Sequence, residues 1–194
     1  MRRNTSSRES SLAKDYGIPE DILVSLYSAI GELVFSWALV EANVNYWIAI
    51  VYQRAGGKHV GKNKEIPWGM ARKIKFLRQC FNHISALEPF KEEAGALLTR
   101  AKSVVKTRDI VVHGIVAEYK SKALELLFVR VDLDSTRTMQ RFTESWLHIN
   151  KILDDSGEAI AIGREALKFT ERLLEAFFLT DEESQRLFKT VFGK

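Results

Sequence analysis

The residues best suited to chemistry lie together in one stretch of the chain, Lys102 to Gly114, whose apolar spacing predicts the end of a helix. In this stretch Asp109 follows Arg108 directly. His113 comes four residues after Asp109, so these two side chains are neighbours on a helix. Histidine transfers protons near neutral pH, whereas arginine carries a permanent charge and binds phosphate through two parallel hydrogen bonds. These side-chain types therefore indicate acid–base chemistry beside a phosphate group.

Hydrophobic periodicity over the rest of the chain predicts a mainly α fold, an up-down bundle of four to five helices with a small β-hairpin after the third helix. The predicted helices cover residues 19–53, 67–84, 88–113, 143–178 and 181–190, and the predicted strands cover residues 115–119 and 124–133. Thr143 is the expected N-cap of the fourth helix. We expect that helix to run through Asp154 to Gly157, with two helices divided at Gly157 as the alternative.

The composition is that of one globular domain with a mild basic excess, because the 194 residues carry a net charge of +4. This charge permits a nucleic-acid partner without requiring one. Residues 1–15 are polar and rich in serine, so we expect a disordered tail before a single helical domain over residues 16–194. The most apolar stretch, 22–52, contains Glu32 and Glu41 and is too polar for a simple membrane span. We therefore expect a cytoplasmic protein with no membrane partner.

Two charged residues break the apolar pattern of their helices. Glu41 lies about 40° from Trp37 around the first helix, inside the apolar stripe, where a carboxylate needs a partner. Arg108 lies within about 20° of the stripe centre of the third helix, between Val104 and Val112. Five residues on a helix are about 140°, so Arg108 and His113 do not share one face. Arg108 would then lie at a dimer seam, or be buried against Glu41, or be turned by Glu41 towards a cleft.

The flank of the third helix carries the remaining charged residues: Lys102, Lys106, Asp109 and His113. The neighbouring Asp109 carboxylate and the helix C-terminus both favour a protonated imidazole at His113. This fits a general acid or a phosphate-binding group. Gly114 is expected to take the left-handed conformation that commonly ends a helix.

The Arg-x4-His pattern of Arg108 and His113, placed near a helix end and followed by Gly114 and a hairpin, resembles the HEPN superfamily of small helical proteins. The resemblance covers residues 20–178. It implies a metal-independent endoribonuclease with no cofactor, acting as a toxin, a defence factor or an RNA-processing enzyme. The site would form where two copies of the motif face each other across a homodimer, and the partners would be RNA and, for a toxin, an antitoxin protein. One subgroup has a tyrosine two positions after the histidine, where this chain has Ile115.

The resemblance makes Arg108 and His113 the catalytic residues, with Asp109 as the polar residue that commonly follows the arginine. From their position in the pattern, we add Glu41 as a supporting residue and Lys102 and Lys106 as RNA contacts. The alternative is a non-catalytic module that binds RNA or a protein partner, for which the basic loop over residues 54–64 would matter more. A helical dimer without nucleic acid is a third possibility. No role is expected for the remaining histidines, for the single cysteine, or for a solvated basic helix face: His59, His83, His148, Cys80, Arg72, Lys73, Lys75 and Arg78.

Overall fold

The computed structural model describes residues 17–60, 66–133 and 140–178. The predicted tail over residues 1–15 and the predicted last helix over residues 181–190 lie outside these ranges. The chain divides into two compact units. Unit 1 consists of the residues up to Phe35 together with Lys106–Gly157, and unit 2 consists of Ser36–Val105 together with the residues from Glu158 onwards. Three helices that are continuous in sequence, those over residues 20–53, 91–113 and 149–178, therefore contribute to both units.

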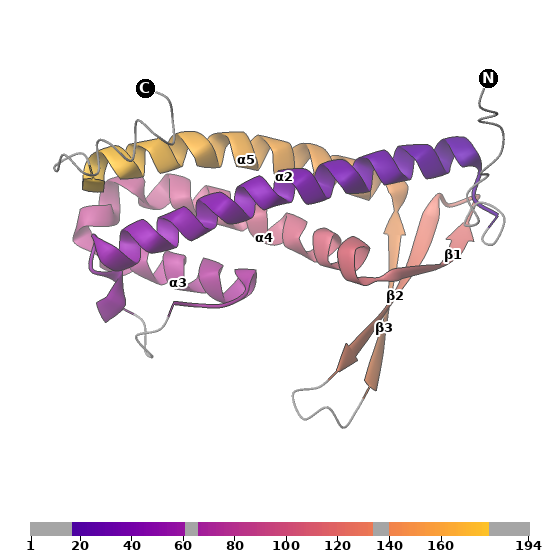
Figure 1. Cartoon of the computed structure of the whole chain (residues 1–194), viewed down its shortest axis with the longest axis horizontal. Helices are drawn as coiled ribbons and strands as arrows, with labels where there is room; N and C mark the ends of the chain where they lie inside the picture. Colours follow the sequence, from indigo (N-terminus) through magenta and orange to yellow (C-terminus); the bar gives the residue numbers. More distant parts are fainter. Residues whose placement is uncertain (1–16, 61–65, 134–139, 179–194) are drawn as a thin grey trace, which may run out of the picture. The chain divides into compact units, whose positions relative to one another are not determined.

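The described residues form a mainly α fold, as predicted (Figure 1). Four α-helices are connected by short 3-10 turns and by one antiparallel sheet. The helices are α2 (Glu20–Gln53), α3 (Met70–His83), α4 (Lys91–His113) and α5 (Ile149–Phe178), and the 3-10 turns are η1 (Gly57–His59) and η2 (Ser85–Phe90). The strands are β1 (Ile115–Lys120), β2 (Glu125–Leu133) and β3 (Gln140–His148), in the order β1-β2-β3.

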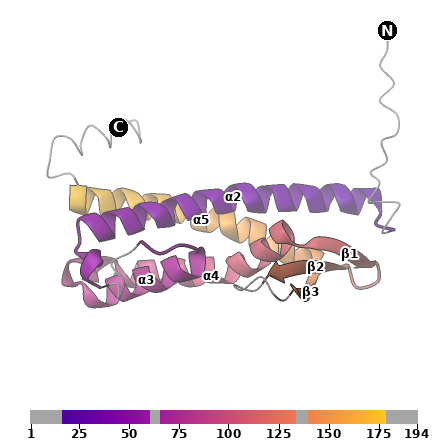
Figure 2. The ribbon, with the colours of Figure 1, turned by 60° about the horizontal axis from the view of Figure 1, so that its bottom comes forward.

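The third strand corrects the prediction for this region. Residues 140–148 form β3, which pairs antiparallel with β2 from Leu133↔Gln140 to Glu125↔His148, so Thr143 is a strand residue and not a helix N-cap. The predicted hairpin is present as β1 and β2, with Ile115 opposite Val129. Figure 2 shows the three strands side by side as one sheet. Helix α5 begins only at Ile149 and then runs without a break past Gly157, as predicted.

Unit 1 is built on the inner face of the sheet. Leu126 and Phe128 of β2 are buried, as expected for alternate residues on one face of a strand. Leu26 and Leu33 of α2 and Ile152 of α5 are buried in the same unit. The Ser156 hydroxyl also donates a hydrogen bond to Glu32 Oε2 at 3.2 Å. The unit therefore combines parts of α2, α4 and α5 with the sheet around one apolar core.

Unit 2 is helical and has an aromatic core. The Trp47 and Phe169 rings meet edge to face with their centroids 4.8 Å apart. Thr170 Oγ1 accepts a hydrogen bond from Trp47 Nε1 at 2.7 Å and donates to Asn43 Oδ1 at 2.6 Å, so a buried polar cluster is satisfied internally. At its surface, Arg100 of α4 pairs with two carboxylates of α5, and these hydrogen bonds raise the pKa of the guanidinium further above its ordinary value.

Helix α2 is apolar on more than its buried face. It has the usual buried stripe, but a second row of large apolar side chains is exposed: Val24, Tyr27, Val34, Phe35, Leu39 and Tyr46. By length and composition alone, α2 is the one helix within the described residues that is long and apolar enough to cross a membrane. This is weak evidence, because a core helix meets the same test. Cytoplasmic location stays an expectation from the sequence.

Candidate active site at the end of α4

The last turns of α4 are held by a buried line that differs from the predicted one. Val104, Thr107 and Val111 are 0, 3 and 8% exposed, whereas Val112 is 38% exposed. The prediction had placed Val112 in the apolar stripe and Arg108 close to its centre. In the structure Arg108 lies beside the buried line, and its side chain remains 25% exposed. Its guanidinium is therefore at the border between the core and solvent.

Arg108, Asp109 and His113 come together within one chain, in unit 1. Arg108 Nη1 donates a hydrogen bond to Asp109 Oδ1 at 2.9 Å and lies 3.5 Å from His113 Nε2. The long arginine side chain thus bridges the angle of about 140° that separates these positions on a helix. Helix angles did not predict this arrangement, because they describe only the directions in which the two side chains leave the helix.

One nitrogen of the Arg108 guanidinium is left without a partner. Arg108 Nε is buried and makes no hydrogen bond with any residue that the structure describes. A buried donor without an acceptor is costly, and in native proteins such groups call for an explanation, such as a role in a site. Nη1 of Arg108 is therefore fixed by Asp109, whereas the Nε–H group remains without an acceptor among the described residues.

Glu41 lies in a different setting from the predicted one. Its side chain is 39% exposed and its Oε1 lies 3.5 Å from Lys73 Nζ of α3, within unit 2. Trp37, Val40 and Val44 form the buried line of this part of α2, and Glu41 lies at its edge. The prediction that the Glu41 carboxylate lies inside the apolar stripe is therefore wrong. The carboxylate bonded to Arg108 is Asp109, and the cation paired with Glu41 is Lys73.

Lys102 and Lys106 are exposed on α4, one helical turn apart. Lys106 belongs to unit 1 with the candidate site, whereas Lys102 belongs to unit 2. Both side chains are exposed, so their ammonium groups face solvent. This agrees with their predicted position on the flank of the helix.

Gly114 ends α4 for a reason other than the predicted one. It does not have a positive φ; within the described residues only Gly17, Gly56 and Gly69 among the glycines do. Its N–H instead donates to the Ile110 carbonyl oxygen at 2.8 Å. A Cβ at this position would lie 2.6 Å from Ile110 O and 3.1 Å from Phe128 Cβ. Glycine is therefore required mainly because the carbonyl of Ile110 in the last turn of α4 leaves no room for a Cβ, and β2 packs tightly against the same position.

Large apolar side chains next to His113 are exposed, which the sequence argument did not foresee. Val112 is 38% exposed and Ile115, the first residue of β1, is 71% exposed. His113 itself is exposed. Ile115 lies on the face of the hairpin that does not carry the buried residues, and this is evident only from its pairing with Val129.

In residues 17–60, 66–133 and 140–178, no three His, Cys, Asp or Glu side chains lie close enough together to hold a metal ion. No protein-family model, curated protein or solved structure matches the chain. The fold and site thus define only a general class, a mainly α protein with a three-stranded sheet and an Arg-Asp-His cluster where its third long helix meets that sheet.

Proposed function

We propose that this protein is a metal-independent endoribonuclease of the HEPN type and that Arg108 and His113 are its catalytic residues. The observation that carries the proposal is the approach of Arg108 Nη1 to within 3.5 Å of His113 Nε2. A proton-transfer group and a permanent cation are the two elements that phosphodiester cleavage by side chains needs.

The proposed reaction is transfer of the phosphoryl group within the RNA strand. The 2′-oxygen attacks the adjacent phosphorus and loses its proton to a base, and the bond from phosphorus to the 5′-oxygen breaks. An acid donates a proton to that leaving oxygen, which gives a 2′,3′-cyclic phosphate and a free 5′-hydroxyl. Arg108 stabilises the extra negative charge on the phosphorane oxygens.

His113 is the base in this scheme. An imidazole can take or give a proton near neutral pH, and Arg108 Nη1, 3.5 Å from Nε2, places a permanent positive charge beside it. The acid would be the His113 of a second copy, so the proposed reaction needs a homodimer.

The homodimer is supported by the surface around His113. Val112 and Ile115, on either side of it in the sequence, are exposed apolar side chains. Exposed apolar surface of this kind marks places where another protein surface is expected to pack. In a symmetric dimer the same patch meets itself, which brings both copies of the motif together. A toxin, defence or processing role and an antitoxin partner belong to the same proposal.

The decisive test is cleavage of single-stranded RNA by the purified full-length chain and by His113→Ala. We expect wild type to leave 2′,3′-cyclic phosphate ends and His113→Ala to be slower by about 100-fold or more. His83→Ala is the matched control, since His83 is also exposed at the end of a helix but belongs to unit 2, and this change should leave the rate unchanged. Equal cleavage by wild type and His113→Ala would overturn the catalytic role.

A non-catalytic RNA-binding or protein-binding module is the second candidate. It is favoured by the Asp109 carboxylate, which already neutralises part of the Arg108 charge. Salt-dependent RNA binding by a dimer that leaves RNA intact would decide for this module.

A further inference from the structure

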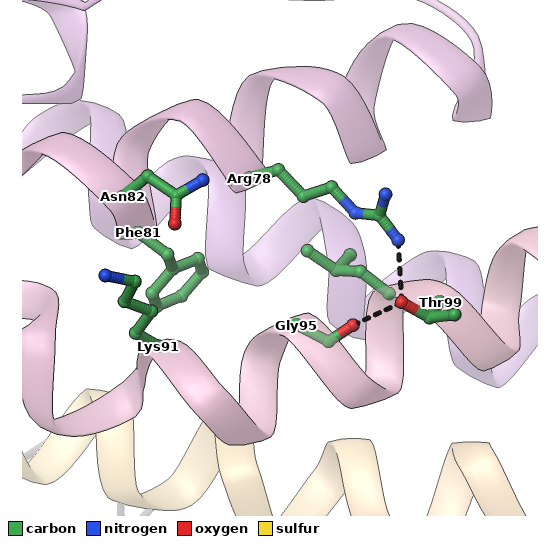
Figure 3. A pocket seen from close by; sticks show the side chains of 7 residues that line it. Arg78, Phe81, Asn82, Lys91, Gly95 and Thr99 are labelled. Carbon is green, nitrogen blue, oxygen red and sulfur yellow. Dashed lines mark hydrogen bonds between the residues drawn. The ribbon is translucent and has the colours of Figure 1, made fainter.

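A pocket in unit 2 has a lining suited to an anion and lies between α3 and the first turns of α4 (Figure 3). Its volume is about 350 Å³. Arg78, Phe81 and Asn82 line it from α3, and Lys91, Gly95, Leu98 and Thr99 line it from α4. Two of these side chains are cationic and none is acidic. The sequence had suggested that Arg78 belongs to a solvated helix face, but it is half-buried here.

Arg78 is fixed across the pocket by a neutral group. Its Nη2 donates a hydrogen bond to Thr99 Oγ1 at 2.7 Å, and the Thr99 hydroxyl in turn donates to the Gly95 carbonyl oxygen at 2.7 Å. Figure 3 shows this chain of two hydrogen bonds from α3 to α4. A hydroxyl orients the guanidinium without neutralising it, so its charge and its remaining N–H groups stay available for a ligand.

Lys91 supplies the second charge. Its Nζ lies 3.5 Å from Glu88 Oε1, but the two side chains are 42 and 65% exposed, so this pair is weak and easily exchanged. In Figure 3, Lys91 and Asn82 lie at one end of the pocket and Arg78 and Thr99 at the other. The Asn82 amide offers both a donor and an acceptor. Between the charged groups the wall is apolar, formed by Phe81 and Leu98.

We propose that this pocket binds a nucleotide phosphate, present as a free mononucleotide or as one residue of an RNA strand. The two cations match the phosphate, the apolar wall suits the sugar or base, and Asn82 suits a base edge. A volume of about 350 Å³ exceeds the space that one inorganic anion fills and falls at the lower end of small-molecule sites. The proposal is separate from RNA cleavage, because Arg108 and His113 belong to unit 1.

Gly95 gives a way to close the pocket without disturbing the fold. It lines the pocket, it lies inside α4, and a Cβ built on it meets no atom within 4 Å. A larger side chain here therefore occupies pocket volume instead of displacing backbone. Replacing a helical glycine also favours the helix, so Gly95→Leu is expected to keep or raise the melting temperature.

The test is calorimetric titration of the full chain with adenosine 5′-monophosphate, adenosine, inorganic phosphate and a short single-stranded RNA at low salt. We expect adenosine to bind at least about tenfold more weakly than the monophosphate, since it lacks the charge-assisted hydrogen bonds. Arg78→Gln and Lys91→Gln should each weaken binding by about tenfold. Arg72→Gln is the matched control, because Arg72 is exposed on α3 and does not line the pocket. Gly95→Leu should abolish binding.

Tight binding of the monophosphate identifies a site for a free nucleotide, and binding of the RNA alone identifies a contact to an RNA strand. The proposal is overturned if no probe binds, if Arg72→Gln weakens binding as much as Arg78→Gln, or if Gly95→Leu leaves binding intact in a folded protein. The RNA titration uses His113→Ala, which should not cleave the strand, and it counts for this pocket only where adding Arg78→Gln weakens binding and adding Arg72→Gln does not. Failure of the cleavage proposal and failure of this one are thus distinguishable.

Discussion

Asp109 Oδ1 accepts a hydrogen bond from Nη1 of the preceding residue, Arg108, at 2.9 Å. Neighbours along a helix point about 100° apart, so this contact forms only because the arginine side chain turns back along the helix surface. The same nitrogen lies 3.5 Å from His113 Nε2. Asp109 therefore determines where the charge of Arg108 lies relative to the imidazole.

Replacing Asp109 by alanine should release the guanidinium and lower the rate of RNA cleavage by about tenfold, since misplacement of a catalytic group by a small distance is costly. Because Asp109 would act through Arg108, kcat should fall while KM changes little. The measurement is the cleavage rate as a function of RNA concentration.

The matched control for this change is Asp154→Ala, which removes an exposed carboxylate of α5 in the same unit. It should leave kcat and KM unchanged. If Asp109→Ala raises the affinity for RNA and leaves kcat intact, the carboxylate only screens Arg108 and does not position it.

Ile115 is expected to lie in the homodimer interface, because it is 71% exposed and follows His113 by two residues. Ile115→Glu would place two like charges against each other at a two-fold axis and should weaken the dimer by at least about tenfold. Analytical ultracentrifugation measures the dissociation constant, and RNA cleavage should fall in parallel with the dimer fraction. Leu167→Glu, at an exposed position of α5 in unit 2, is the control. An unchanged dimer in Ile115→Glu would place the interface elsewhere.

The residues of the candidate site could be predicted from the sequence, but the arrangement of their side chains could not. The residue types and spacing identified Arg108, Asp109 and His113, because proton transfer and phosphate binding restrict the choice of side chain. Helix angles then predicted that Arg108 and His113 point apart. These angles describe the direction in which a side chain leaves the helix and not the position of the end of a long side chain. Val112 was also placed in the core, whereas the buried position is Val111. The pocket at Arg78 depends on how two helices pack, which spacing within one helix does not contain.

The fold was predictable where one pattern dominated. Helices α2, α3 and α4 follow the spacing of their apolar residues, and α5 keeps its phase through Gly157. Strand β3 was missed because Trp146 lies three residues before Ile149 and so continues the helical spacing of α5 backwards by chance. The aromatic and β-branched residues Phe142, Thr143 and Trp146 were the competing signal, and pairing with β2 decided between them.

Cys80 should be chemically silent in the folded protein. It is fully buried, and burial raises the pKa of its thiol to about 12. A thiol of this kind is almost entirely protonated at pH 8, so a disulfide reagent should modify the unfolded chain and leave the folded chain unmodified over the same time. Modification of folded protein at a rate near that of the unfolded chain would contradict the burial.

The same shift in pKa predicts how stability depends on pH. The folded thiol ionises near pH 12, whereas an unfolded thiol ionises near pH 8.5, at its ordinary value. Between these values the unfolded state loses its proton first, so the free energy of unfolding decreases as the pH rises, and this contribution is fully present below about pH 8.5. Cys80→Ala lacks this component and should show a shallower loss of stability above pH 9 in denaturant titrations. Parallel curves for the two proteins would exclude it.

Gly114 links the stability of unit 1 to the position of His113. In Gly114→Ala the new methyl group would stand 2.6 Å from Ile110 O and 3.1 Å from Phe128 Cβ, both of which belong to packed elements. Either the helix end or β2 has to move, and overpacking of this kind costs about 1–3 kcal/mol. The free energy of unfolding should decrease by that amount in denaturant titrations.

Gly157→Ala is the control for the glycine substitution itself. Gly157 lies inside α5 in the same unit, and a Cβ there meets nothing within 4 Å, so alanine should stabilise the helix by about 0.5–1 kcal/mol. Because the movement at Gly114 displaces the neighbouring His113, Gly114→Ala should also slow RNA cleavage under conditions where it remains folded, whereas Gly157→Ala should cleave as wild type does. A Gly114→Ala protein as stable as wild type would show that the helix end and β2 are not in close contact in solution.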